Sequence, residues 1–142
     1  MRIRSKRYSN WDNRTKQILK NLTLSDGYMR HYVVAAPNSR TFLAYSTGGE
    51  VMGWTLVLEF QGNFEANTFV DPKWRRQGVA TRLILSAARR FGRLILYYWN
   101  DENQALFYEL RNRAPREIEV ACWWNVQHAH EKWLRLVKAW HI

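Results

Sequence analysis

The alternation of hydrophobic and polar positions predicts three consecutive β-strands in the first half of the chain. The runs rich in β-branched and aromatic side chains are residues 40–46, 50–60 and 64–70. Gly48 and Gly49 separate the first two runs, and Asp71-Pro72 closes the third. Short Gly-containing connections join antiparallel neighbours. We therefore expect residues 40–70 to form a three-stranded antiparallel meander.

After Pro72 the spacing of apolar residues changes from two to about 3.6, which predicts an amphipathic helix. Its apolar face would hold Val79, Ala80, Leu83, Ile84, Ala87 and Phe91. Gly92 is placed to end this helix. The continuous apolar run over residues 93–99 has the length of a strand that is covered on both faces.

Two further helices are predicted from capping residues. Asp12 can cap a helix over residues 13–24, and Asp101 can cap one over residues 102–112 that Pro115 terminates. Helices would therefore precede the meander and follow the strand at residues 93–99.

The two ends of the chain are less regular. Residues 1–7 fit a frayed arm or a short edge strand, and residues 117–126 alternate as a strand. Residues 128–142 fit a strand or a helix, and we favour the strand. The element order predicts an α/β (α+β) layer fold in which helices flank a mixed, mostly antiparallel sheet of six or seven strands.

Composition restricts the class of protein. The chain has 142 residues, of which 46% are hydrophobic and 15% aromatic, so it should fold, and we expect one domain over residues 1–142. Charges interrupt every apolar run, so no membrane partner is expected, and residues 1–7 lack the apolar core of a signal peptide. Cys122 is the single cysteine and cannot form an internal disulfide. A cytoplasmic location is expected.

The net charge of +10 is unevenly distributed. Residues 1–40 carry nine basic and two acidic residues, residues 41–72 carry no basic and four acidic ones, and residues 73–116 carry ten and three. Positive potential favours phosphate-bearing ligands or nucleic acid. An acidic protein or RNA partner would bind through residues 1–40, although a basic surface that only aids solubility is the alternative.

The chemistry is concentrated at residues 70–81, where a strand ends at Val70 and a helix begins near Gly78. Unpaired backbone N–H groups at a helix start bind anions. Gly78 and Ala80 keep side-chain bulk away from such a ligand. Charge and a hydroxyl group come from Arg75, Arg76 and Thr81. A Gly-containing helix start without a ligand is the alternative.

This segment resembles the acetyl-CoA signature V-x-P-x-x-R-x-x-G-x-A of the GCN5-related N-acetyltransferases (GNAT). The fixed positions are filled by Val70, Pro72, Arg75, Gly78 and Ala80. Glu50–Trp54 is similar to the family's third strand, and Asp101–Leu110 is similar to its fourth helix. The resemblance covers about residues 40–112. It implies a GNAT-like acyl-CoA N-acyltransferase fold with acetyl-CoA as co-substrate and no metal.

The resemblance also implies cofactor contacts. The pantetheine arm would bind the main chain at Phe69 and Val70. The pyrophosphate would bind the N–H groups of Arg75, Arg76, Gln77, Gly78, Val79, Ala80 and Thr81. Asn103 is a further cofactor candidate, but Asp101 occupies the family's usual Asn position, and residues 111–113 replace its usual Gly-Phe.

Two catalytic residues follow from the same resemblance. Tyr108 is placed to protonate the leaving thiolate, because a phenol stays protonated at neutral pH, unless it is only a packed aromatic. Glu65 is the candidate general base, and an exposed carboxylate at a sheet edge is the alternative. Glu59 and Asp71 are substitutes for it.

The function predicted in this way is acetyl transfer from acetyl-CoA to a primary amine by direct attack in a ternary complex. One alternative is a catalytically weak GNAT-like protein that binds CoA and engages a partner protein. A third is an acetyltransferase that acts on RNA or charged tRNA, for which the basic segments are the support. The sequence does not name the amine or protein acceptor, and a homodimer is compatible with it.

Overall fold

A computed structural model describes residues 1–25, 39–60, 62–98 and 100–122. Its strands are β1 (Arg2–Arg7), β2 (Arg40–Tyr45), β3 (Val51–Phe60), β4 (Asn63–Val70), β5 (Leu94–Tyr98) and β6 (Ile118–Cys122). Its helices are α1 (Asn13–Ser25), α3 (Val79–Phe91) and α4 (Asp101–Arg113), with short 3₁₀ turns η1 (Tyr8–Asn10) and η2 (Pro72–Trp74). No helix within the described ranges is long and apolar enough to cross a membrane.

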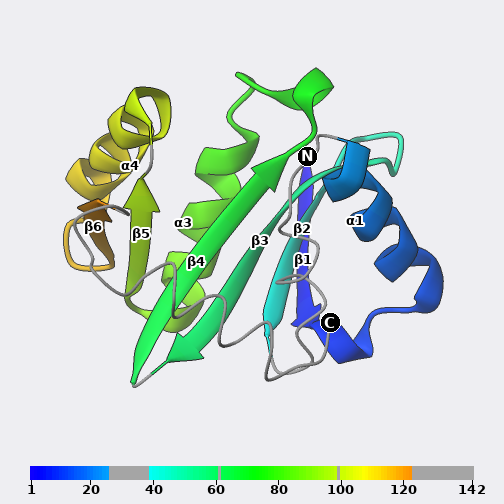
Figure 1. The fold of residues 1–142 in the computed structure, drawn as a ribbon, viewed down its shortest axis with the longest axis horizontal. Helices are drawn as coiled ribbons and strands as arrows, with labels where there is room; N and C mark the ends of the chain where they lie inside the picture. Colours follow the sequence, from blue (N-terminus) through cyan, green and yellow to red (C-terminus); the bar gives the residue numbers. More distant parts are fainter. Residues whose placement is uncertain (26–38, 61, 99, 123–142) are drawn as a thin grey trace.

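The strands form one sheet in the order β1-β2-β3-β4-β5-β6 (Figure 1). Neighbours from β1 to β4 are antiparallel, whereas β4–β5 and β5–β6 are parallel. The predicted meander and mixed sheet are confirmed, and the start of the chain is an edge strand rather than a frayed arm. The prediction for residues 128–142 lies outside the described residues.

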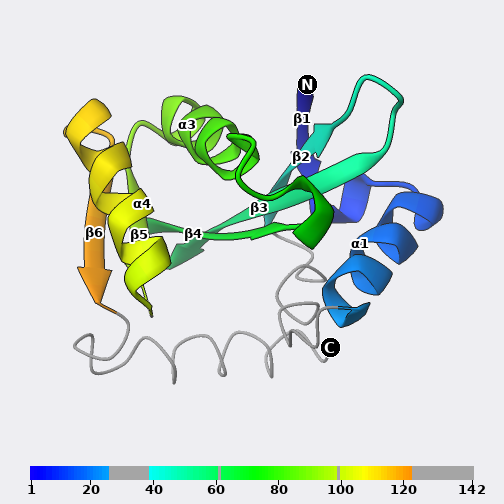
Figure 2. The same ribbon diagram turned by 90° about the horizontal axis from the view of Figure 1, so that it is seen from above.

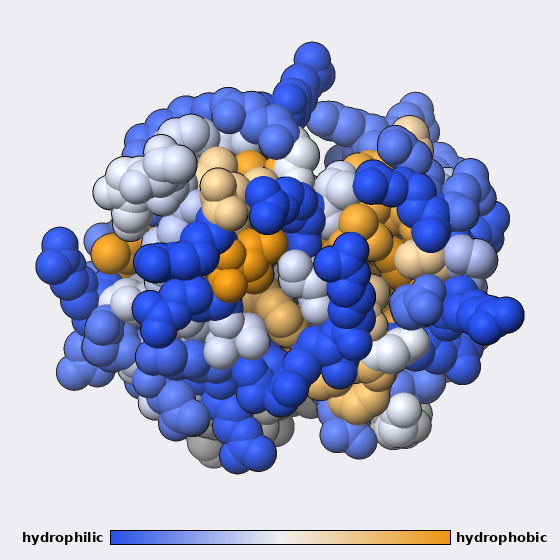
Figure 3. Space-filling view, turned by 180° about the vertical axis from the view of Figure 1, so that it is seen from behind, coloured by the Kyte–Doolittle hydropathy of each residue, from blue (hydrophilic) through white to orange (hydrophobic). Residues whose placement is uncertain are grey.

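Helices cover both faces of the sheet, with α3 on one side and α1 on the other (Figure 2). Under α3 and α4 lies a buried cluster that includes Phe42, Leu83 and Leu96. On the α1 face a second cluster includes Leu19 and Trp54. Seen from behind, on the α3 side, hydrophilic residues cover most of the surface, and hydrophobic atoms show mainly in the hollows between them (Figure 3).

The parallel strands β4 and β5 separate soon after they meet. Their ladder contains only the pairs Glu65↔Ile95 and Ala66↔Leu96, although β4 continues to Val70. The partner on the other side, β3, stays paired with β4 up to Val70. The strands therefore diverge toward the end of the sheet where α3 begins.

Glycine and asparagine set the ends of the helices. Gly78 caps α3 with φ of 80°, and Gly92 ends it with φ of 77°, a left-handed conformation that glycine adopts without strain. The cap of α4 is Asn100 and not Asp101 as the sequence suggested. Asn100 and Asn103 exchange backbone-to-side-chain hydrogen bonds, which makes a capping box.

Gly53 allows β3 to approach the end of β4 closely. It lies opposite Val70 in the ladder. A Cβ atom built there would lie 2.6 Å from the carbonyl oxygen of Phe69 and 3.0 Å from the Cα of Val70. Because these are backbone atoms, only a shift of β4 could make room.

We predict that Gly53→Ala destabilises the protein by about 1–3 kcal/mol, as overpacking in a core does. Gly48→Ala is the matched control, since its new methyl group meets only the Ser46 hydroxyl at an ordinary 3.8 Å. Chemical denaturation of both variants tests this prediction. Equal stability of the two variants would contradict it.

Candidate functional site

A cavity of about 580 Å³ opens where β4 and β5 diverge. It is lined by the end of β4, by the connection between β4 and α3, by the first two turns of α3, and by the first half of α4. The lining residues are Thr68, Phe69, Val70, Trp74, Arg75, Arg76, Gly78, Val79, Ala80, Thr81, Ile84, Asn100, Glu102, Asn103, Leu106 and Phe107. The cavity contacts consecutive residues of β4, whose side chains point to opposite faces of the sheet.

Hydrogen bonds within the turn fix the strand end that faces this cavity. The Asp71 carboxylate accepts from the Lys73 N–H at 3.2 Å, and the Trp74 N–H donates to the Asp71 carbonyl at 2.8 Å. The Arg75 Nε donates to the Val70 carbonyl at 2.9 Å, with its guanidinium carbon 5.6 Å from the centre of the Phe69 ring. Arg75 therefore positions the turn as well as adding charge.

The backbone between the turn and α3 takes a left-handed conformation at Arg76 (φ 62°) and at Gly78 (φ 80°). For arginine this conformation costs about 1–2 kcal/mol, and strain of this kind is concentrated at functional sites. A Cβ atom at Gly78 would meet nothing within 4 Å. The surface in front of the first N–H groups of α3 is therefore open to a ligand.

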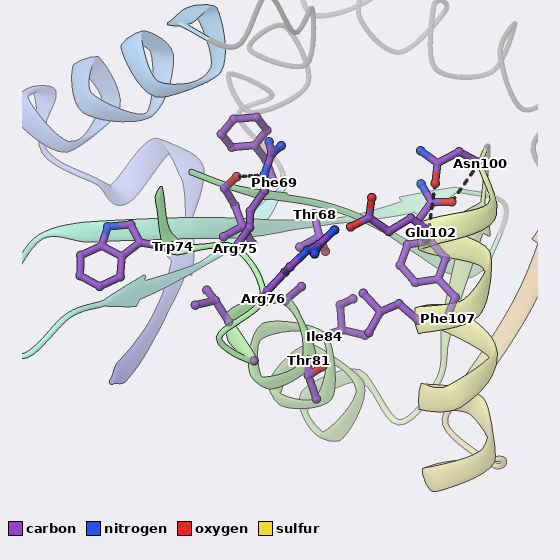
Figure 4. A pocket seen from close by; sticks show the side chains of 16 residues that line it. Thr68, Phe69, Trp74, Arg75, Arg76, Thr81, Ile84, Asn100, Glu102 and Phe107 are labelled. Atoms are coloured by element: carbon purple, nitrogen blue, oxygen red, sulfur yellow. Dashed lines mark hydrogen bonds between the residues drawn. The ribbon is translucent and has the colours of Figure 1, made fainter. Parts of the chain in front are cut away.

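Opposite charges face each other across the cavity. Arg76 extends from the turn and Glu102 from the first turn of α4, and the two side chains point toward one another (Figure 4). Behind them the wall is apolar, with Ile84 and Phe107. The N-terminus of α3 and Arg76 together make one side of the cavity attractive to an anion.

All the predicted cofactor residues except Gln77 line this cavity. The side-chain amide of Gln77 instead faces the Lys73 carbonyl at 3.5 Å. Asn103 lines the cavity, but its side-chain oxygen accepts the Asn100 N–H at 3.2 Å as part of the helix cap. The contacts of these residues with a cofactor stay predictions.

Tyr108 lies next to the cavity lining without being part of it. It is half-buried, and its ring centre is 5.8 Å from that of Tyr98. The Arg111 guanidinium carbon lies 4.6 Å from the centre of the Tyr108 ring. Loss of solvent contact raises the pKa of Tyr98, and hydrogen bonds to Cys122 and Tyr108 raise it further. The hydroxyl groups of the two tyrosines therefore lie close together at the end of β5.

Glu65 is fully buried, so the alternative of an exposed carboxylate is wrong. Its Oε1 accepts a hydrogen bond from the Tyr97 hydroxyl at 2.8 Å. Burial, and then this bond, raise the pKa of Tyr97. Glu65 shares a strand face with Phe69, which packs in the cluster of the α1 side. The pair thus lies on the sheet face opposite α3.

The other acidic candidates lie in simpler surroundings. Glu59 is exposed on β3, and Asp71 caps η2. Glu50 forms an ion pair with Lys73. The described residues contain no group of three or more His, Cys, Asp or Glu side chains that could hold a metal ion.

Several lining residues were not predicted from the sequence. They are Thr68, Trp74, Ile84, Asn100, Glu102, Leu106 and Phe107. Helical spacing offered a signal for two of them, because Leu106 and Phe107 follow Asn103 at i+3 and i+4 and so share its face. Glu102 carried no such signal, since its role depends on how α4 meets the turn.

Comparison with known proteins supports the resemblance. Residues 37–111 match the model of the Acetyltransferase (GNAT) domain. In fold, the chain is similar to an acetyltransferase of the GNAT family from Staphylococcus aureus Mu50, with 13% identity over 78% of this chain and 83% of that one and a TM-score of 0.55. It is also similar to an aminoglycoside 6'-N-acetyltransferase complexed with coenzyme A, with 17% identity over 63% of this chain and a TM-score of 0.51.

The match spans only 54% of the aminoglycoside acetyltransferase chain. None of the curated proteins matches the sequence. The family match covers more than half of the 142 residues and includes β2 to β5 and most of α4. The chain therefore belongs to the GNAT acetyltransferase family.

Proposed function

We propose that this acetyltransferase binds acetyl-CoA in the cavity between β4, α3 and α4 and transfers the acetyl group to a primary amine. The observation that carries the proposal is the open, positively charged start of α3 at the point where β4 and β5 diverge. Acetyl-CoA fits this arrangement because its pyrophosphate is anionic and its pantetheine arm is extended.

The start of α3 fits a pyrophosphate. Gly78 leaves open space in front of the helix N-terminus, and Arg76 reaches into the cavity from the preceding residues. Backbone N–H groups and a guanidinium group bind phosphate oxygens with charge-assisted hydrogen bonds. Glu102, on the opposite wall, would disfavour a phosphate there and so confine the anionic end to the α3 side.

The gap between the strands fits the extended arm of the cofactor. The ladder between β4 and β5 stops at Ala66, although β4 itself runs on to Val70. An amide-bearing arm could lie along this part of β4 in the place of a neighbouring strand. Acetyl-CoA would supply an activated thioester, and Tyr108 would donate a proton to the departing sulfur.

Deprotonation of the amine requires a base, and Glu65 is too deeply buried to contact the amine itself. Tyr97, whose hydroxyl donates to Glu65, is the group that would pass the proton on. The Tyr97 oxygen would accept the proton from the ammonium group while its own proton passes to the Glu65 carboxylate. The raised pKa of Tyr97 keeps the phenol protonated, as a relay of this kind needs.

A methyl group added at Gly78 should block the pyrophosphate. We expect Gly78→Ala to weaken acetyl-CoA binding about tenfold or more in calorimetry, because the new Cβ points into the open space at the helix start. Gly62→Ala is the matched control. Gly62 has φ of 81° and equally open surroundings but lies in the β3–β4 turn. Both variants should lose about 1–2 kcal/mol of stability, so equal acetyl-CoA affinity in the two would overturn the assigned site.

Tyr108→Phe should lower kcat by about a hundredfold while the acetyl-CoA dissociation constant stays unchanged. Release of free thiol with a panel of amines measures the rate. Tyr8→Phe, on the opposite side of the molecule, serves as the control. Full activity of Tyr108→Phe would show that Tyr108 is a packed aromatic residue without a catalytic role. Acetyl-CoA binding without turnover of any amine by the wild type would favour the partner-binding alternative.

Glu65→Gln and Tyr97→Phe should each lower kcat at neutral pH by about a hundredfold. The defect should shrink as the pH rises toward the pKa of the amine, because an amine that is already neutral needs no base. A pH profile of kcat for both variants tests this relay. A defect that stays constant across pH would show that the two residues act only through the structure.

A further inference from the structure

We infer that Arg7, Arg40 and Arg90 form a phosphate-binding cluster that holds the backbone of an RNA strand, and that the cations of edge strand β1 add positive potential beside it. The cluster lies at the end of the sheet away from the cavity, where α3 ends (Figure 1). The inference does not depend on the proposed amine acetylation.

Three elements bring these arginines together. Arg7 and Arg40 lie directly opposite each other in the β1–β2 ladder. Arg90 belongs to the last turn of α3. The next residue of that helix, Phe91, packs edge-on against Phe42 of β2 with ring centres 6.3 Å apart. This contact fixes the end of α3 over the start of β2.

The described residues provide no ion pair for any of the three guanidinium groups. The Arg40 Nη1 donates to the neutral Ser5 hydroxyl at 3.0 Å. Partial burial lowers the pKa of Arg40, and the charges of Arg90 and Arg7 lower it further. Like charges opposite each other destabilise a sheet. A bound phosphate would remove this repulsion, and the planar fork of arginine matches its oxygens.

Edge strand β1 adds positive charge beside the cluster, on the other face of the sheet. Arg2, Arg4 and Lys6 alternate along it on the face opposite Arg7. At about 3.4 Å per residue the strand is about 20 Å long, with Arg7 at the cluster and its first residues at the end of the sheet where the cavity lies (Figure 1). Asp12 is the only acidic residue in the described segment 1–25, and it caps α1 by accepting the Thr15 N–H at 2.7 Å.

Cations on an edge strand can have the simple role of preventing aggregation through that edge. That explanation covers β1, but it does not cover Arg40, which lies on the second strand with the charges of Arg7 and Arg90 near it. A second copy of the chain is a poor occupant, since pairing β1 with itself would set cation against cation. A phosphodiester strand suits this group of cations because each of its units carries a negative charge.

The test is binding of a fluorescein-labelled oligouridylate, followed by anisotropy over a series of KCl concentrations. The double variant Arg7→Gln/Arg90→Gln removes two exposed members of the cluster and leaves the hydrogen-bonded Arg40 in place. The control is Arg113→Gln/Arg116→Gln, which removes two exposed charges near the end of α4, toward the opposite edge of the sheet. Thermal melting and acetyl-CoA titration of each variant check the fold.

We expect the cluster variant to bind the RNA about tenfold more weakly at low salt. Its plot of log affinity against log salt should become shallower by about 0.7 for each phosphate that the variant no longer neutralises. The control should keep wild-type affinity, and the cluster variant should melt no lower than wild type, because repulsion has been removed. Equal losses in both variants would overturn the inference. So would displacement of the RNA by polyglutamate at equal charge concentration, which would indicate an acidic polypeptide as the partner.

Discussion

The separation of β4 from β5 after two paired residues is the constraint on which the site depends. A parallel ladder that stops early opens one edge of β4 toward the gap, and the backbone groups along a strand edge need partners of some kind. The same divergence makes room for α3 to begin at the sheet end with its N–H groups facing the gap. Gly53 supports the arrangement, since it lets β3 hold the end of β4 while the other side is open.

Glu65 and Tyr97 show how this constraint affects the chemistry. Glu65 lies in the short paired part of the β4–β5 ladder and Tyr97 just beyond it, and the carboxylate is buried and hydrogen-bonded. A carboxylate held in this way would take part in proton transfer through a neighbour, and the Tyr97 hydroxyl donates a hydrogen bond to it. The sequence placed Glu65 on the right strand, but burial depends on how β5 and the α1 face meet, which has no local signature.

Local pattern predicted most of the fold because short-range chemistry sets it. The meander followed from glycine turns between β-rich runs, and α3 followed from its apolar stripe and Gly92. The cap of α4 was displaced by one residue because Asn100 and Asp101 are both good caps, and only the reciprocal bonds with Asn103 choose between them. Glu102 and Tyr97 were missed because their surroundings arise from contacts between elements far apart in the sequence.

Helix α3 has 13 residues, so it is about 20 Å long, and its two ends differ in sign. Its peptide dipoles add to a partial positive charge at the N-terminus and a partial negative charge at the C-terminus. At the first turn the helix backbone itself therefore attracts an anion, in addition to the charge of Arg76. At the last turn the helix itself repels an anion. An anion site at that end would therefore need cationic side chains from separate elements, which the proposed cluster of Arg7, Arg40 and Arg90 would supply.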